Sequence, residues 1–88
     1  MATMLSGDLT LSRIPALLSQ APVLAANAVL DLAAVERTDS AGLAFLIELS
    51  RQAQQRGGAL QFRNAPAQMQ QLAQFFGVDA VLRLNPAT

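Results

Sequence analysis

The chain has 88 residues, which is enough for one domain and too few for two independent hydrophobic cores. Hydrophobic residues make up 52% and charged residues only 14%, where about a quarter charged is usual. This composition is equally typical of an alanine-rich, well-packed small domain and of a domain that keeps part of its apolar surface for a partner interface. Six acidic and six basic residues give zero formal net charge, and the arginines are scattered along the chain, which argues against a nucleic-acid-binding role.

The residue inventory also argues against catalysis. The chain contains no Cys and no His, so it lacks a disulfide framework, the commonest metal ligand and the commonest general base. We therefore predict no catalytic residue, no metal site, no cofactor and no enzymatic activity. The first ten residues do not resemble a signal peptide, and apolar stretches such as Ala41–Ile47 fall short of the roughly 20 residues that a membrane span needs. These features predict a cytoplasmic protein without a membrane span.

The N-terminal third gives the weaker structural signals. Met4-Leu5 and Leu9–Ser12 flank the turn signal Gly7-Asp8, which predicts a hairpin of two short strands. The stretch Ile14–Leu24 predicts a short helix with one proline in its first turn, ended or kinked at Pro22.

A strand and a long helix follow. Ala28–Leu32 is a compact apolar run that suits a central strand. Residues 41–56 predict a helix that stops at Gly57-Gly58, and Thr38, Asp39 and Ser40 before it are all good N-cap types. Its predicted core face contains Leu43, Leu46, Leu49, Ser50 and Ala53.

Two further side chains, Phe45 and Ile47, flank that core face on both edges. They make the apolar stripe wider than one buried face requires. We therefore expect at least one of them to be exposed, and Phe45 to be available to a partner.

The remaining elements are a strand and a second amphipathic helix. Residues 59–63 alternate with period two, which predicts a strand with Leu60 and Phe62 facing inward. A helix then runs from Asn64 and Pro66 to Gly77. The predicted core positions of this part are Met69, Leu72, Ala73, Phe76, Val78, Val81 and Leu82, with Phe75 off the stripe and residues 84–88 without a clear signal.

The segment from Val29 to Leu43 carries a resemblance to a known family. Asp31-Leu32 ends the predicted strand, and Asp39-Ser40-Ala41-Gly42-Leu43 resembles the central signature of STAS domains, with Ala41 where a second hydroxyl or a glycine often stands. The resemblance covers residues 28–82, whereas the stretch between Leu11 and Ala28 is shorter than the family's first helix. It implies a single STAS domain over residues 1–88, an α/β fold with a mixed sheet of four to five strands and helices packed mainly on one face.

Two branches of the family imply two functions. MlaB-like members are accessory subunits that bind and regulate the ATPase of a phospholipid-transporting ABC complex, which places them at the inner membrane through that partner. Anti-sigma factor antagonists are instead phosphorylated by a partner kinase at the hydroxyl residue, and phosphorylation breaks the complex. The Asp-Ser-Ala-Gly-Leu form, the short chain and the wide apolar helix favour the MlaB-like branch. A ligand-sensing STAS domain stays a third possibility.

Both branches place the functional contact at the start of the long helix. The N-terminus of a helix offers free N–H donors and a partial positive charge, which suit a hydroxyl at a contact or a phosphate. The simpler interpretation is that Asp39 or Ser40 only caps the helix, a role worth about 0.5–2 kcal/mol. Asp31 is implied by the resemblance to shape the surface beside Ser40, with a purely structural hydrogen-bonding role as the alternative. The predicted partner-binding residues are Thr38, Asp39, Ser40, Ala41, Gly42 and Phe45, with Ser40 also the possible phosphorylation site.

Overall fold

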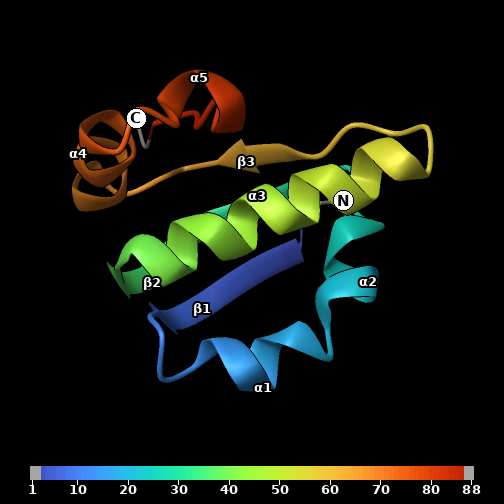
Figure 1. Ribbon diagram of the computed structural model, residues 1–88, viewed down its shortest axis with the longest axis horizontal. Coiled ribbons are helices and arrows are strands. Elements are labelled where there is room, and N and C mark those ends of the chain that lie inside the picture. The colour runs from blue at the N-terminus through green and yellow to red at the C-terminus, as the bar shows by residue number, and fades with distance from the viewer. Residues whose placement is uncertain (1–2, 87–88) are drawn as a thin grey trace.

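The computed structural model describes residues 3–86, so both ends of the domain predicted over residues 1–88 lie outside the described range. Each strand is followed along the chain by one or two helices (Figure 1). In chain order they are β1 (Thr3–Leu9), α1 (Ile14–Leu18), α2 (Ala21–Ala25), β2 (Val29–Thr38), α3 (Ser40–Gln55), β3 (Gln61–Arg63), α4 (Ala67–Phe75) and α5 (Asp79–Leu82).

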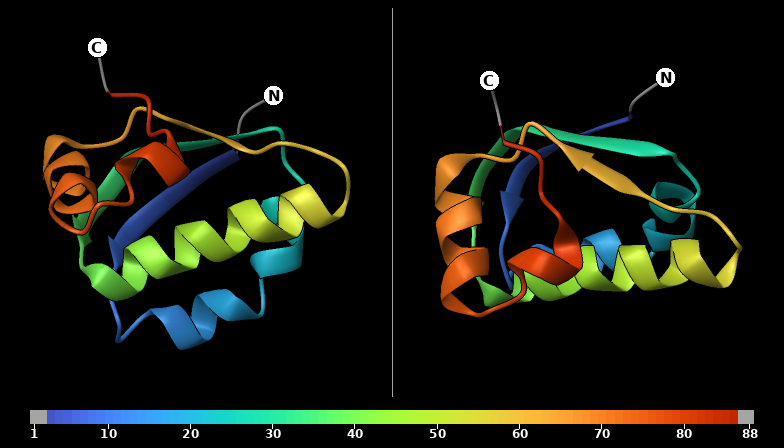
Figure 2. Two further views of the ribbon diagram at one scale, coloured as in Figure 1. Left: turned by 45° about the horizontal axis from the view of Figure 1, so that its top comes forward. Right: turned by 90° about the horizontal axis from the view of Figure 1, so that it is seen from above.

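The sheet has the strand order β1-β2-β3, and both pairs of neighbours are parallel. Parallel neighbours need a crossover connection, which α1 and α2 supply between β1 and β2 and α3 supplies between β2 and β3. Figure 2 shows α1, α2 and α3 on one face of this sheet. The α/β class is therefore confirmed, but the prediction of a mixed sheet with four to five strands is wrong for residues 3–86, which form three parallel strands.

The predicted N-terminal hairpin is also wrong. Gly7 and Asp8 lie inside β1, which runs as one strand beside β2 with register shifts between Met4 and Ser6 and between Gly7 and Leu9. Gly7 has a φ of 84°, a conformation that glycine adopts without steric cost. The turn signal thus marks a β-bulge and not a chain reversal.

The predicted helix over Ile14–Leu24 is two helices. Each begins with a proline in its first turn, Pro15 in α1 and Pro22 in α2. Proline lacks the N–H that a first-turn residue does not need, so it favours the start of a helix. Pro22 therefore starts α2, and the chain bends before it, at Ser19 and Gln20.

The core lies between the sheet and α3. The predicted inward positions Leu43, Leu46, Leu49 and Ala53 of α3 are buried. Phe45 is only 2% exposed and Ile47 is partly buried, so the expectation of a surplus apolar edge at Phe45 is wrong. The physical reason is that α3 packs against α1 and α2 as well as against the sheet, and a helix buried on two sides needs a wider apolar stripe.

The C-terminal predictions hold only in part. Met69, Ala73 and Leu82 are buried, whereas Phe76 is 50% exposed and Val81 is 62% exposed, so the prediction that these two residues are core is wrong. The helical spacing that placed Phe76 inside extends beyond the element, because α4 ends at Phe75 and Phe76 is its C-cap.

Candidate functional site

The candidate site is the junction where β2 passes into α3. β2 ends at Thr38, Asp39 follows in an extended conformation, and α3 begins at Ser40. One oxygen of Asp39, Oδ1, accepts a hydrogen bond from the backbone N–H of Gly42 at 3.1 Å. The capping role belongs to Asp39, and Ser40 at the first helical position is exposed. The Ser40 hydroxyl therefore faces solvent at the positive end of a 16-residue helix.

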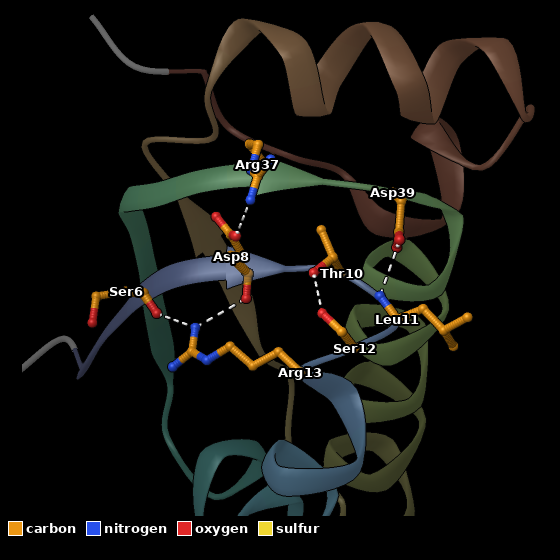
Figure 3. A network of polar contacts seen from close by, with 8 residues as sticks. All are labelled: Ser6, Asp8, Thr10, Leu11, Ser12, Arg13, Arg37 and Asp39. Carbon is orange, nitrogen blue, oxygen red and sulfur yellow. Dashed lines mark hydrogen bonds and ion pairs between the residues drawn. The ribbon is translucent and has the colours of Figure 1, made fainter.

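The second oxygen of Asp39 reaches a different part of the chain. Oδ2 accepts a hydrogen bond from the backbone N–H of Leu11 at 3.0 Å (Figure 3). The Asp39 N–H donates to the carbonyl oxygen of Leu9 at 3.2 Å. The bond from Leu11 is the main cause that lowers the pKa of Asp39, and the bond from Gly42 adds to it. Asp39 is therefore ionised at neutral pH and joins the loop after β1 to the start of α3.

Gly42 sets how closely α3 approaches β1. It is buried, and a Cβ atom built at this position would overlap the backbone carbonyl oxygen of Leu9. The glycine of the Asp-Ser-Ala-Gly-Leu motif thus has a packing role. It lets the first turn of α3 lie directly on the end of β1.

Two predicted partner-binding residues have little surface to offer. Thr38 is 6% exposed, its carbonyl oxygen accepts a hydrogen bond from Gln68 at 3.0 Å, and its own hydroxyl has no hydrogen-bond partner among the described residues. Phe45, at 2% exposure, belongs to the core. The junction therefore presents Ser40 and part of Ala41 to the outside, while Thr38, Gly42 and Phe45 support them from within.

An apolar groove lies beside Ser40. Its volume is about 260 Å³, and it is lined by Ser40, Leu43, Ala44, Ile47, Phe76 and Val78. Of the described residues in this lining, Ser40 alone has a polar side chain. Phe76 packs edge-to-face on Phe75, with ring centroids 5.3 Å apart, and Phe75 is 80% exposed. The sequence pattern placed Phe76 and Val78 in the core and so did not predict that they line this groove, although two adjacent phenylalanines before a glycine were a signal that one of them faces solvent.

Asp31 does not belong to this site. Its carboxylate accepts hydrogen bonds from the backbone N–H of Ala33 at 2.9 Å and from the side chain of Asn64 at 3.2 Å. These two bonds, that from Ala33 first, lower the pKa of Asp31. Ser40 follows nine residues later, so about 20 Å or more of extended strand separates the two residues. The structural hydrogen-bonding role is the one observed.

A metal site or an activated serine at the junction would need particular side chains. Within residues 3–86 no three His, Cys, Asp or Glu side chains gather into a possible metal site. Ser40 has no histidine or lysine to activate it, since the sequence contains neither. None of the described helices is both long and apolar enough to cross a membrane.

Comparison with known proteins agrees with the motif and the fold. The family model described as "Mlab, STAS domain" matches residues 2–84, nearly the whole chain. A comparison with curated proteins gave no match.

Proposed function

Because this chain belongs to the MlaB-like STAS domain family, we propose that it is an accessory subunit that binds and regulates the ATPase of a bacterial phospholipid-transporting ABC complex. STAS domains are generally non-enzymatic regulatory or accessory proteins. A subunit of this kind serves outer-membrane lipid asymmetry and lies in the cytoplasm, held at the inner membrane by its partner.

One observation carries the proposal: an exposed hydroxyl at an open helix start lies on the edge of an apolar groove. Ser40 supplies a directional hydrogen bond, and the groove with Phe76 supplies apolar area and an aromatic anchor. Among the described residues, no charged side chain lines the groove. Depletion of charge at the centre of an interface is typical of lasting protein contacts, which favours a stable subunit over a transient encounter.

The proposal is tested by isolating the tagged chain at native expression, identifying the ATPase that accompanies it, and titrating the purified ATPase with variants. Ser40→Arg should abolish binding, because it combines steric exclusion with repulsion from the positive helix end. Ser40→Ala should weaken binding only about fivefold, the equivalent of about 1 kcal/mol for one hydrogen bond.

The matched control is Gln55→Arg, which adds the same side chain at the exposed far end of α3 and should bind as the wild type does. Circular dichroism verifies that each variant is folded. A folded Ser40→Arg variant that binds the ATPase with wild-type affinity would show that the proposed docking site is wrong.

The exposure of Ser40 also favours a second candidate, an anti-sigma factor antagonist. Its hydroxyl takes no part in capping and is open to a kinase. In that case a small kinase-fold protein accompanies the chain, phosphorylates Ser40, and loses affinity for Ser40→Asp, which mimics the phosphate. In the transporter case no kinase modifies Ser40. Mass spectrometry of the chain after incubation with the isolated partner and ATP separates the two functions.

A further inference from the structure

We propose that the turn after β1 is a second anchor for the same protein partner, and that Asp39 positions it. The turn (residues 10–13) carries Leu11, whose side chain is 69% exposed. The inference rests on the proposed function, because it concerns the partner that docks at Ser40. It adds a contact on the other side of the helix start from the groove.

The turn is fixed in place although it lies at the surface. The N–H groups of Arg13 and Ile14 both donate to the carbonyl oxygen of Thr10, at 2.9 and 3.1 Å. The N–H of Leu11 donates to Asp39 Oδ2 at 3.0 Å. The N–H of Asp39 donates to the carbonyl oxygen of Leu9, just before the turn, so two hydrogen bonds join this part of the chain to the start of α3. An apolar side chain on a fixed backbone loses little conformational freedom when a partner binds, so its burial contributes more to affinity.

The location connects the turn to the proposed docking site. The start of α3 lies between α4 on one side and the loop from β1 to α1 on the other, in both Figure 1 and Figure 2. The groove with Phe76 occupies the side toward α4, and Leu11 is hydrogen-bonded through its backbone to the residue next to Ser40. A partner that covers Ser40 therefore has an apolar anchor on each side of it.

The charges around the turn indicate the chemistry of the partner segment. Arg37 forms an ion pair with Asp8 at 2.7 Å. Arg13 donates hydrogen bonds to the carbonyl oxygens of Ser6 and Asp8 (Figure 3). The charged groups shown there are thus paired within the domain, although the Arg37 side chain stays 78% exposed. The tip of the turn presents the Leu11 side chain and the hydroxyls of Thr10 and Ser12, 3.4 Å apart. This surface fits a partner segment with an apolar side chain and polar backbone groups at hydrogen-bonding distance.

The substitution Asp39→Asn distinguishes the two hydrogen bonds that the carboxylate of Asp39 accepts, from Gly42 and from Leu11. Asn is as good an N-cap as Asp, so Asp39→Asn can keep the bond from Gly42 through its single carbonyl oxygen. Its NH₂ group cannot accept the N–H of Leu11, so that bond is lost. The variant therefore keeps the helix cap while it removes the side-chain bond that ties the turn to the start of α3.

The experiment titrates the isolated ATPase with the whole chain and five variants, one of which is Ser40→Arg. Leu11→Ser should weaken binding at least tenfold. Val23→Ser is the matched control, because Val23 is 72% exposed on α2, which lies toward the other end of α3, and it should bind within twofold of the wild type. Asp39→Asn should weaken binding about as much as Leu11→Ser. The double variant, Leu11→Ser with Asp39→Asn, should bind the ATPase as tightly as the single variant with the lower affinity, since both changes remove the same contact.

Amide hydrogen exchange gives a second readout that does not depend on the partner. The Leu11 amide should exchange at least tenfold faster in Asp39→Asn than in the wild type, while the Gly42 amide keeps its protection. Additive effects of the two changes, or an unchanged Leu11 amide, would overturn the positioning role of Asp39. Wild-type affinity for Leu11→Ser, with binding still abolished by Ser40→Arg, would overturn the second anchor and leave the proposed function standing. Wild-type affinity for folded Ser40→Arg would instead overturn the proposed function itself.

Discussion

Gly42 is the residue on which the geometry of the site depends most. Any side chain at this position meets the carbonyl oxygen of Leu9, which belongs to the backbone of β1 and cannot rotate away. Gly42→Ala should therefore lower the free energy of unfolding by about 1–3 kcal/mol, the usual cost of overpacking a tight contact. Urea denaturation followed by circular dichroism measures it.

The control for that substitution is Gly58→Ala. A Cβ atom at Gly58 meets only the carbonyl oxygen of Ala53 at 3.7 Å, which is an ordinary contact, so its stability should change by less than about 0.5 kcal/mol. Gly57 and Gly77 are unsuitable because both have positive φ. Equal stability of the two variants would contradict the close approach of α3 to β1.

Asp39 makes stability depend on pH in a predictable direction. Its pKa in the folded state lies below the ordinary value of 3.8, mainly because Leu11 and Gly42 donate to it. The unfolded chain therefore binds a proton more readily, and the contribution of Asp39 is present above pH 3.8 and lost as the pH falls through the lowered folded pKa.

Urea midpoints of the wild type and of Asp39→Asn, measured between pH 7 and pH 2.5, test this dependence. The wild type should have the larger free energy of unfolding at pH 7. The difference should shrink below about pH 4, where the carboxylate of the unfolded chain takes up a proton before that of the folded chain does. An advantage that stays constant down to the lowest pH would show that the ionised carboxylate is not responsible for it.

At the scale of elements, α3 and the end of α4 divide the aromatic residues into two roles. Phe45 is 2% exposed in α3, so Phe45→Ser should cost about 3–5 kcal/mol of stability through the cavity it leaves. Phe76 is 50% exposed on the groove, so Phe76→Ser should cost less than about 1 kcal/mol of stability but weaken partner binding by about 1–2 kcal/mol. Urea denaturation and a binding titration of both variants measure the two costs. The reverse pattern would place the docking surface elsewhere.

The sequence predicted elements best where local chemistry decides them. The N-cap residues before Ser40 and the glycines after Arg56 predicted closely where α3 begins and ends. The alternation of apolar and polar residues around Phe62 predicted β3. Gly7-Asp8 gave the wrong prediction because glycine serves a bulge as well as a turn, and only the pairing of β1 with β2 distinguishes the two.

Local contacts also decide which features of the candidate site could be predicted from the sequence. The cap that Asp39 makes on Gly42 joins near neighbours in the chain, so residue type and position were sufficient to predict it. The burial of Phe45 and Thr38 depends on which elements pack against α3 and β2. The periodicity of one helix does not predict which elements these are. Leu11 is joined to Asp39 by a hydrogen bond between residues 28 positions apart in the chain, and no local sequence pattern predicts such a contact.

At the scale of the whole molecule, the domain is small, has zero formal net charge and exposes several large apolar side chains. These are Met4, Leu11, Leu18, Val23, Phe75, Phe76 and Val81, each at least 50% exposed. A domain of this size buries only about 60–65% of the surface of its unfolded chain, so its own stability is modest. Near-zero charge also gives little protection against association. Both features are typical of a protein that is most stable when its partner covers part of its surface.

This leads to a prediction for the thermal unfolding of the complex. A partner that binds only the folded chain stabilises it by about 2.7 kcal/mol when its free concentration is 100 times the Kd. For a domain of 60–100 residues, each kcal/mol raises the Tm by about 4–8 °C, so the Tm of the chain should rise by about 10–20 °C with the isolated ATPase in that excess. Scanning fluorimetry with a dye on the chain follows its own transition. Ser40→Arg should unfold at the same temperature with and without the ATPase. A rise of equal size for this variant would show that the partner stabilises the chain through a surface other than the start of α3.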